Sequence, residues 1–156
     1  MRREFGKVIA DLVAQDKRTY LLSLDVGFGI FDRLKSENPS HYFNLGVTEQ
    51  ASIGVASGMA LEGLKPYVFT ITPFLAERPF EQIKLDLVEQ RADVKLVGFW
   101  DYPNDGPTHI TKDICKVCDA LGIPLYQPRN AAETRELILR VHEIKGPAFF
   151  SLTRNP

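Results

Sequence analysis

Glu49 is a single carboxylate at the head of a run of small and apolar residues that covers positions 51–60. A charged carboxylate is costly to bury unless another group pairs with it or a proton neutralises it, so Glu49 is a candidate for catalysis or binding. A structural interpretation is also open. Glu49 could lie in the first turn of a helix, where it favours the helix dipole and where Thr48 or Asn44 caps the helix. The residue types alone do not decide between the two.

A second candidate for proton chemistry is His109, which ends the segment D-G-P-T-H (105–109). Histidine gains and loses a proton near neutral pH, and a turn that contains Gly106 and Pro107 restricts the direction of the side chain that follows. His109 is therefore a candidate proton carrier. The alternative is an ordinary loop histidine in solvent.

Cys115 and Cys118 have the C-x-x-C spacing of many redox and zinc sites. They fall within D-I-C-K-V-C-D-A-L, which is typical of the middle of a helix with both sulfurs near one face, whereas a thioredoxin-like pair follows a strand and opens a helix. No histidine stands at ligand spacing around them. We predict two buried, unreactive thiols and no metal site.

The elements that must position these residues follow from the apolar pattern, which alternates between helical and strand periods. We predict helices over 3–15, from the turn at 26–30 to about residue 37, and over 47–62, 74–90, 111–121 and 130–144. We predict strands over 19–25, 41–45, 65–71, 93–100, 123–128 and 147–153, and a loop over 101–109. Gly63 and Gly122 fit the positions just past two helix ends.

Because strands and helices alternate without a hairpin signal, the pattern indicates an α/β fold. We expect a single three-layer domain with a mostly parallel sheet and helices on both faces. Ligands of such sheets bind beyond the carboxyl ends of the strands. The loops after the strands, which carry Asp25, Glu49, Phe74 and His109, are therefore the places where a site is expected.

Composition limits the class of protein. The 156 residues suffice for one domain, and 44% hydrophobic and 25% charged residues are ordinary for a globular chain. A net charge of −1 gives no general attraction to nucleic acid or to an anionic membrane. No apolar run approaches the length of a membrane span, and the N-terminal residues lack the apolar core of a signal peptide, so we expect a cytoplasmic protein.

Seven segments, taken in order, resemble the pyrimidine-binding domain of transketolases, enzymes that use thiamine diphosphate to move two-carbon ketol units between sugars. The segments are R-R-E-F-G, S-L-D, F-N-L-G-V-T-E-Q-A-S-I-G-V-A-S-G-M-A-L-E-G, P-F-L-A-E-R-P-F-E-Q-I, V-K-L-V-G, D-G-P-T-H and S-L-T-R. Each is weak alone, but together they span essentially the whole chain. The resemblance implies the pyrimidine-binding fold of thiamine diphosphate enzymes over residues 1–156.

The resemblance gives Glu49 a role. In the family, the matching glutamate hydrogen-bonds a ring nitrogen of the cofactor's aminopyrimidine and favours the tautomer that removes a proton from the thiazolium carbon. An apolar wall, which the small residues after Glu49 would form, keeps such a carboxyl from simply ionising in water. Phe74 and Phe80 lie where the family places rings against the aminopyrimidine. We expect Phe74, nearer to the strand end, to stack, although either ring could instead belong to the core.

Arg78 lies in the same segment as these rings. The resemblance suggests that it reaches the cofactor pocket, and the alternative is an ion pair with Glu81 or Asp86 on the helix surface. Asp25 matches a family aspartate near the cofactor, with an N-cap of the following helix as the alternative.

Residues for the substrate follow from the same resemblance. By match, His109 lies near the reacting carbon, Asp105 contacts a sugar hydroxyl, and Arg3 (or Arg2) and Arg154 bind phosphate. Two departures count against ordinary pentose and hexose phosphates. Gly29 occupies the place of the family's usual serine, and the loop before Asp105 is short and lacks the expected histidine.

The resemblance also implies a partner. The family binds the diphosphate and its metal with a separate domain that carries G-D-G and an asparagine pair, and this chain shows neither, nor a third, C-terminal domain. We therefore expect thiamine diphosphate to be shared with a diphosphate-binding subunit that holds Mg²⁺. We expect this chain to be the smaller subunit of a split transketolase, which is a heterotetramer with a homodimer contact inside it. Alone, this subunit should expose an apolar face near Glu49 and Phe74 and self-associate through it. A domain taken from a longer chain is the other explanation.

Two further functions remain open. One is a deoxyxylulose-phosphate-synthase-like or keto-acid-dehydrogenase-like half-enzyme, which keeps the cofactor but changes the reaction. The other is a non-catalytic interaction module of the same fold. The presence of Glu49, Phe74 and His109 argues against the second.

Overall fold

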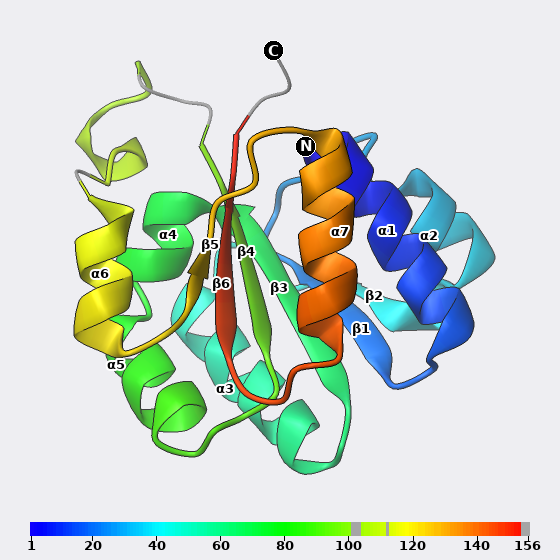
Figure 1. The fold of residues 1–156 in the computed structure, drawn as a ribbon, viewed down its shortest axis with the longest axis horizontal. Helices are drawn as coiled ribbons and strands as arrows, with labels where there is room; N and C mark the ends of the chain where they lie inside the picture. The colour runs from blue at the N-terminus through cyan, green and yellow to red at the C-terminus, as the bar shows by residue number, and fades with distance from the viewer. Residues whose placement is uncertain (101–103, 112, 154–156) are drawn as a thin grey trace.

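The computed structural model describes residues 1–100, 104–111 and 113–153, and it contains a six-stranded sheet in the order β2-β1-β3-β4-β6-β5 (Figure 1). All strand pairs among the described residues are parallel, so the carboxyl ends of the strands meet at one edge. The strands are β1 (Thr19–Ser23), β2 (Tyr42–Asn44), β3 (Lys65–Ile71), β4 (Lys95–Phe99), β5 (Leu125–Tyr126) and β6 (Ala148–Leu152).

Helices cover both faces of this sheet (Figure 1). One layer packs on a core shared by α1 (Arg2–Gln15), α2 (Asp32–Glu37) and α7 (Ala131–His142). The other core is shared by α3 (Glu49–Leu61), α4 (Thr72–Glu77), the turns that follow it and α6 (Ile114–Leu121). The predicted three-layer α/β domain is confirmed. Within the described part of the chain, no helix combines the length and the hydropathy that crossing a membrane requires.

Aromatic rings join the first helical layer to the centre of the sheet. Phe69 of β3 stacks on Phe5 of α1 at 5.4 Å and on Phe99 of β4 at 5.0 Å between ring centroids. Phe31, just before α2, meets Phe69 edge-on at 4.9 Å. All four rings are fully or almost fully buried. Such offset and edge-on contacts add to the free energy of burying the rings, so this cluster fixes α1 and α2 against the strands.

The predicted helix over 74–90 is wrong as a single element. The chain instead forms α4 (Thr72–Glu77), the short α5 (Phe80–Gln82) and a π-helical segment (Ile83–Val88). Pro79 explains the break, because proline has no N–H for the helical ladder and its ring clashes with the preceding turn. The break matters because it places Arg78, the residue before the proline, at the end of α4.

Other boundaries moved for identifiable reasons. The helix predicted over 111–121 begins at Ile114, because Asp113 caps it by accepting a hydrogen bond from the Lys116 N–H. The strand predicted over 123–128 is reduced to two residues at the sheet edge. Gly63 lies just past the end of α3 with φ of +81°, as predicted.

The prediction of two buried thiols is wrong for Cys115, which is exposed, and right for Cys118, which is buried. Residues three apart on a helix are offset by only about 60°, so the buried face includes Cys118 and ends before it reaches Cys115. Burial raises the pKa of the Cys118 thiol to about 12, so that thiol is unreactive. No cluster of metal-ligating side chains occurs among the described residues.

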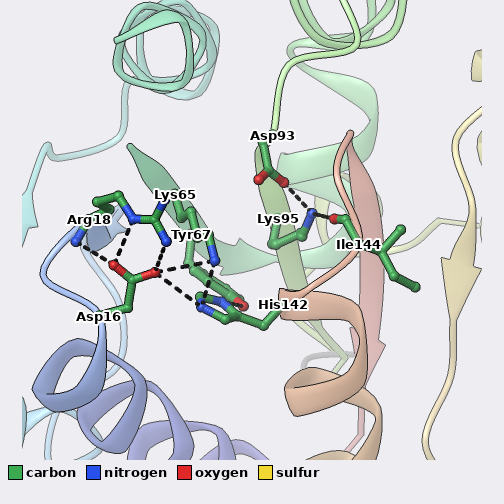
Figure 2. A network of polar contacts seen from close by, with 8 residues as sticks. All are labelled: Asp16, Arg18, Lys65, Tyr67, Asp93, Lys95, His142 and Ile144. Carbon is green, nitrogen blue, oxygen red and sulfur yellow. Dashed lines mark hydrogen bonds and ion pairs between the residues drawn. The ribbon is translucent and has the colours of Figure 1, made fainter. Parts of the chain in front are cut away.

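A buried polar network closes the opposite, amino-terminal edge of the sheet (Figure 2). His142 of α7 is 3% exposed; its Nδ1 lies 2.9 Å from the Tyr67 hydroxyl and its Nε2 lies 3.3 Å from Lys65 Nζ. An ammonium only donates hydrogen bonds, so Nε2 accepts and Nδ1 carries the proton of a neutral ring. Lys65 also pairs with Asp16 at 3.2 Å. The network therefore ties α7, β3 and the end of α1 together.

Lys95 anchors the same edge on the neighbouring strand (Figure 2). Its side chain is 3% exposed, and Nζ donates to Asp93 Oδ1 at 2.6 Å and to the carbonyls of Ile144 and Gly146 at 2.7 Å each. Burial lowers the pKa of Lys95, and the Asp93 carboxylate opposes that effect. Three acceptors satisfy all three ammonium protons, so this buried cation joins β4 to the turn before β6.

Stability should fall with acidification because of His142. Burial, followed by the charge of Lys65, lowers the pKa of His142 below its ordinary value of 6.5 in the folded chain, although Glu143 and Asp16 partly oppose the shift. The unfolded chain then binds the proton at a higher pH than the folded chain. The free energy of unfolding should therefore have its full value above about pH 6.5. Below that pH it should decrease by at most about 1.4 kcal/mol per pH unit. Urea denaturation across that range measures the slope.

The variant His142→Gln keeps a neutral hydrogen-bonding group and should flatten the slope. The matched control His41→Gln removes a histidine outside the network and should leave it intact. A wild-type stability that is constant, or that increases, on acidification through this range would contradict the assignment.

Candidate functional site

Glu49 is the first residue of α3 and follows the loop from the carboxyl end of β2. It is 6% exposed. Thr48 holds the N-cap position, but its hydroxyl donates to the Leu45 carbonyl at 2.8 Å instead of capping the helix. Asn44 does not cap it either, since its Oδ1 accepts from the N–H groups of Asp25 and Gly46. Glu49 thus has the favourable first-turn position and still needs a partner for its buried charge.

Arg78 is that partner. Its Nη1 donates to Glu49 Oε1 at 2.6 Å, while the arginine side chain remains 37% exposed. The expected alternative, a pair with Glu81 or Asp86, is not what the structure shows. The guanidinium carbon also lies 3.5 Å from the centroid of the Phe74 ring, a cation–π contact. One guanidinium therefore joins the carboxylate of α3 to an aromatic face of α4.

His109 contacts the same ring. Its imidazole meets Phe74 at 4.8 Å between ring centroids, with the planes inclined by 61°. Thr111 holds the His109 loop against α4, because its hydroxyl donates to Glu77 Oε1 at 2.7 Å. The structure thus brings together four of the predicted site residues, in the order Glu49, Arg78, Phe74 and His109.

The close approach of α4 to β4 sets the position of Phe74. A Cβ placed on Gly98 of β4 would lie 2.5 Å from Oγ1 of Thr72, the first residue of α4. Any larger residue at position 98 would push the start of α4 outwards. Gly98 therefore allows Phe74 to stand directly beyond the carboxyl ends of β3 and β4.

A second hollow opens at the same edge of the sheet on the side of α1. Asp25 and Arg2 line it together with an apolar wall formed by Val26, Gly27, Phe28, Ile30 and Phe99. Arg2 lies 5.0 Å above the Phe99 ring, and Phe28 is 87% exposed. The alternative of Asp25 as an N-cap is wrong, because α2 begins at Asp32 after Phe31. Asp25 instead turns the chain with φ of +56°.

The remaining predicted residues stand apart from this cluster. Phe80 is 37% exposed at the start of α5, beyond Pro79. Asp105 is exposed in the His109 loop, and Arg3 is exposed in the first turn of α1, next to Arg2. Arg154 lies outside the described residues. No role among these four follows from the geometry.

The predicted buried wall after Glu49 is only half correct. Ile53 and Ala56 are buried, but Ala51, Gly54, Val55 and Gly58 are exposed. The exposed four repeat with helical spacing, so they form one outward stripe of α3. A shallow hollow adjoins this stripe and is lined by Val47, Thr48, Glu49, Gln50, Ala51 and Arg78. The carboxyl of Glu49 therefore lies between the core and an apolar surface.

Sequence reasoning missed the pairing of Glu49 with Arg78 and the exposure of Phe28. The first depends on the approach of α3 to α4, which Gln50 reinforces by donating to the Arg78 carbonyl at 3.2 Å. A partial signal exists, since Arg78 follows Phe74 by one helical turn and can cover its face.

Comparison with protein families gives a match to the family described as transketolase, pyrimidine binding domain, over residues 1–156. A protein of Rhodococcoides fascians named uncharacterized 33.6 kDa protein in fasciation locus is 31% identical over 153 residues, which are 96% of this chain and 49% of that protein. The 1-deoxy-D-xylulose-5-phosphate synthase of Pseudomonas paraeruginosa is 33% identical over 153 residues, 92% of this chain and 23% of the enzyme. The chain thus spans half or less of the length of these relatives.

Among solved structures, one described as a split gene transketolase, inactive beta4 tetramer, superposes with a TM-score of 0.88. It is 26% identical, and the match covers 99% of this chain and 51% of that chain. The transketolase of Campylobacter jejuni superposes with a TM-score of 0.87 at 18% identity, over 99% of this chain and 25% of that chain, which supports the fold alone.

The Glu49–Arg78 pair should contribute measurably to folding. A double-mutant cycle with Glu49→Gln and Arg78→Gln should give a coupling energy of about 1 kcal/mol in urea denaturation, since solvent screens the partly exposed arginine. The control is the exposed pair Arg129–Glu133, with side chains 85% and 28% exposed. Its coupling should stay below about 0.5 kcal/mol. A Glu49–Arg78 coupling no larger than that of the control would show that the contact is too weak to neutralise Glu49.

Proposed function

Because the chain belongs to the transketolase pyrimidine-binding domain family, we propose that it forms the pyrimidine-side half of a thiamine diphosphate site. The enzyme that it completes transfers a two-carbon ketol unit between sugars. Transketolases and 1-deoxy-D-xylulose-5-phosphate synthases use thiamine diphosphate. The observation that carries the proposal is the juxtaposition of the buried Glu49 carboxyl and the Phe74 ring face at the carboxyl edge of the sheet.

The residues present fit the aminopyrimidine of this cofactor. The fit is supported by Arg78, whose planar, N–H-donating guanidinium contacts Glu49 and Phe74 at once. The space between carboxylate and ring therefore accepts a flat group that offers a hydrogen bond in its plane. An aminopyrimidine is such a group.

Each residue then has a task. Glu49 shares a proton with a ring nitrogen, Phe74 stacks on the ring, and His109, held against Phe74, moves a proton at the substrate. When bound, the cofactor supplies the carbon nucleophile that carries the two-carbon unit. Asp25 and Asp105 would contact the cofactor and a sugar hydroxyl, as the resemblance implies.

We propose that another chain or domain binds the diphosphate and Mg²⁺. No group of histidine, cysteine and carboxylate side chains in the described ranges could hold a metal ion. In our proposal a diphosphate-binding transketolase subunit holds both, and two copies of each chain form a heterotetramer. Sugars or sugar phosphates are the substrates.

A deoxyxylulose-phosphate-synthase-like reaction is the second candidate, favoured by the 33% identity to such an enzyme. The two reactions use different donors. Ketose donors such as ketose phosphates support the first candidate and pyruvate supports the second, so a donor panel separates them.

The outward stripe of α3 is the proposed contact surface. Val55 and Leu61 are 47% and 68% exposed, and a Cβ on Gly54 or Gly58 would meet no atom within 4 Å. Small residues let another helix approach closely, and exposed apolar patches mark protein contacts. The solved split gene transketolase is described as an inactive beta4 tetramer, which supports self-association of this chain when its partner is absent.

Glu49→Gln should abolish cofactor activation. We expect the complex of this chain with a co-purified diphosphate-binding partner to lose about 10²–10⁴-fold in kcat, because the amide cannot share the proton. The measurements are ketol transfer with thiamine diphosphate and Mg²⁺, and hydrogen–deuterium exchange at the thiazolium carbon. Glu62→Gln, at the exposed end of the same helix, is the control and should change neither. Normal turnover by a folded Glu49→Gln complex would disprove the role.

Val55→Glu should weaken self-association. A charge on the α3 stripe must be desolvated in any tight contact there, so the chain should shift towards monomer in sedimentation equilibrium and capture less partner. The control is Leu139→Glu, because Leu139 is also exposed but lies on α7, across the sheet. If Leu139→Glu dissociates the oligomer and Val55→Glu does not, the contact surface lies elsewhere.

A further inference from the structure

Arg78 already makes the two contacts that the proposed function assigns to the aminopyrimidine. Its Nη1 donates to Glu49 Oε1 at 2.6 Å, and its guanidinium carbon lies 3.5 Å from the centroid of the Phe74 ring. A guanidinium is planar, and its N–H donors lie in its plane. The same plane that would receive the coenzyme ring is therefore taken by a side chain of the chain itself.

We propose that Arg78 takes the place of the coenzyme ring in the isolated chain: its guanidinium occupies the site between Glu49 and Phe74 and leaves when the aminopyrimidine binds. The inference rests on the proposed function, because it assigns a competitor to that same site. It changes the expected role of Arg78 from a cofactor ligand to a group that the cofactor displaces.

The guanidinium can leave without a change of fold. The Arg78 side chain is 37% exposed, and it borders the shallow hollow beside α3. Its backbone is held separately, because Gln50 donates to the Arg78 carbonyl at 3.2 Å and Pro79 ends the helix at this point. Rotation of the side chain alone brings the charge into water, where arginine is well solvated.

Glu49 cannot leave in the same way. It is 6% exposed, so its carboxyl stays at the site and exchanges one planar partner for another. The buried carboxylate therefore has a partner both before and after the exchange. The exchange also means that the coenzyme must compete with Arg78, so the binding-competent state of the isolated chain is a minor fraction and the apparent affinity is reduced by that fraction.

Binding of the aminopyrimidine half of the coenzyme to the whole chain tests the inference. The probe is 4-amino-5-hydroxymethyl-2-methylpyrimidine, titrated at millimolar concentration and followed by NMR shifts of the Phe74 ring and of the α3 amides. Arg78→Met removes the planar cation but keeps an apolar side chain. With the wild-type site open in about 10% of the molecules, removal of the guanidinium should make the variant bind the probe about tenfold more tightly.

Three variants complete the design. Arg78→Lys keeps the charge near Glu49 without the flat face, so its affinity for the probe should lie between those of the wild type and Arg78→Met. Arg129→Met removes an arginine paired with Glu133 at 3.1 Å elsewhere and should bind the probe as the wild type does. Glu49→Gln combined with Arg78→Met should lose the gain, because the ring then lacks its carboxylate partner.

Equal or weaker binding by Arg78→Met overturns the inference, since Arg78 would then help to hold the ring. The proposed function is tested separately, by measuring the activation of thiamine diphosphate in the wild-type co-purified complex. An active complex together with no gain in Arg78→Met ends the inference alone. An inactive complex, with no probe bound by any variant, ends both.

Discussion

A carboxylate that is almost withdrawn from water must keep a partner, and this requirement organises the carboxyl edge of the molecule. Glu49 is placed at the start of α3, and Arg78 reaches it from the end of α4. The arginine covers Phe74, and Phe74 in turn supports His109. This series of contacts starts from the buried charge of Glu49 and connects two helices and a loop that are distant in the sequence.

The two edges of the sheet differ in how tightly their polar side chains are held. At the amino-terminal edge, His142 and Lys95 are buried and fully engaged with neighbouring groups, which ties helices and strands together. At the carboxyl edge, charged and aromatic side chains remain partly open to solvent. A parallel sheet directs every strand end and its following loop to one side, which leaves the other side free for rigid packing. The division allows the open edge to exchange partners without loosening the core.

Much of this arrangement could be predicted from the residues, and the exceptions have physical causes. The alternation of strand and helix patterns predicted the fold because each pattern is local. The apolar period continues across Pro79 and predicts one helix after Phe74, but the missing N–H of the proline breaks that helix. The partner of Glu49 could not be predicted, because it depends on how closely α4 approaches α3. The apolar composition of residues 51–60 predicts a buried wall, but one stripe of α3 faces outwards, because composition does not say which chain covers an apolar surface. The chemical roles of Glu49 and His109 remain predictions.

The strands at the two borders of the sheet are very short. Its outermost strands, β2 and β5, have three and two residues, and they flank longer central strands. Unpaired backbone N–H and C=O groups on a sheet border are the usual template for runaway strand addition, and so short a border offers few of them. Even at high concentration, this domain is therefore poorly suited to growing into fibrils by addition of strands at its sheet borders.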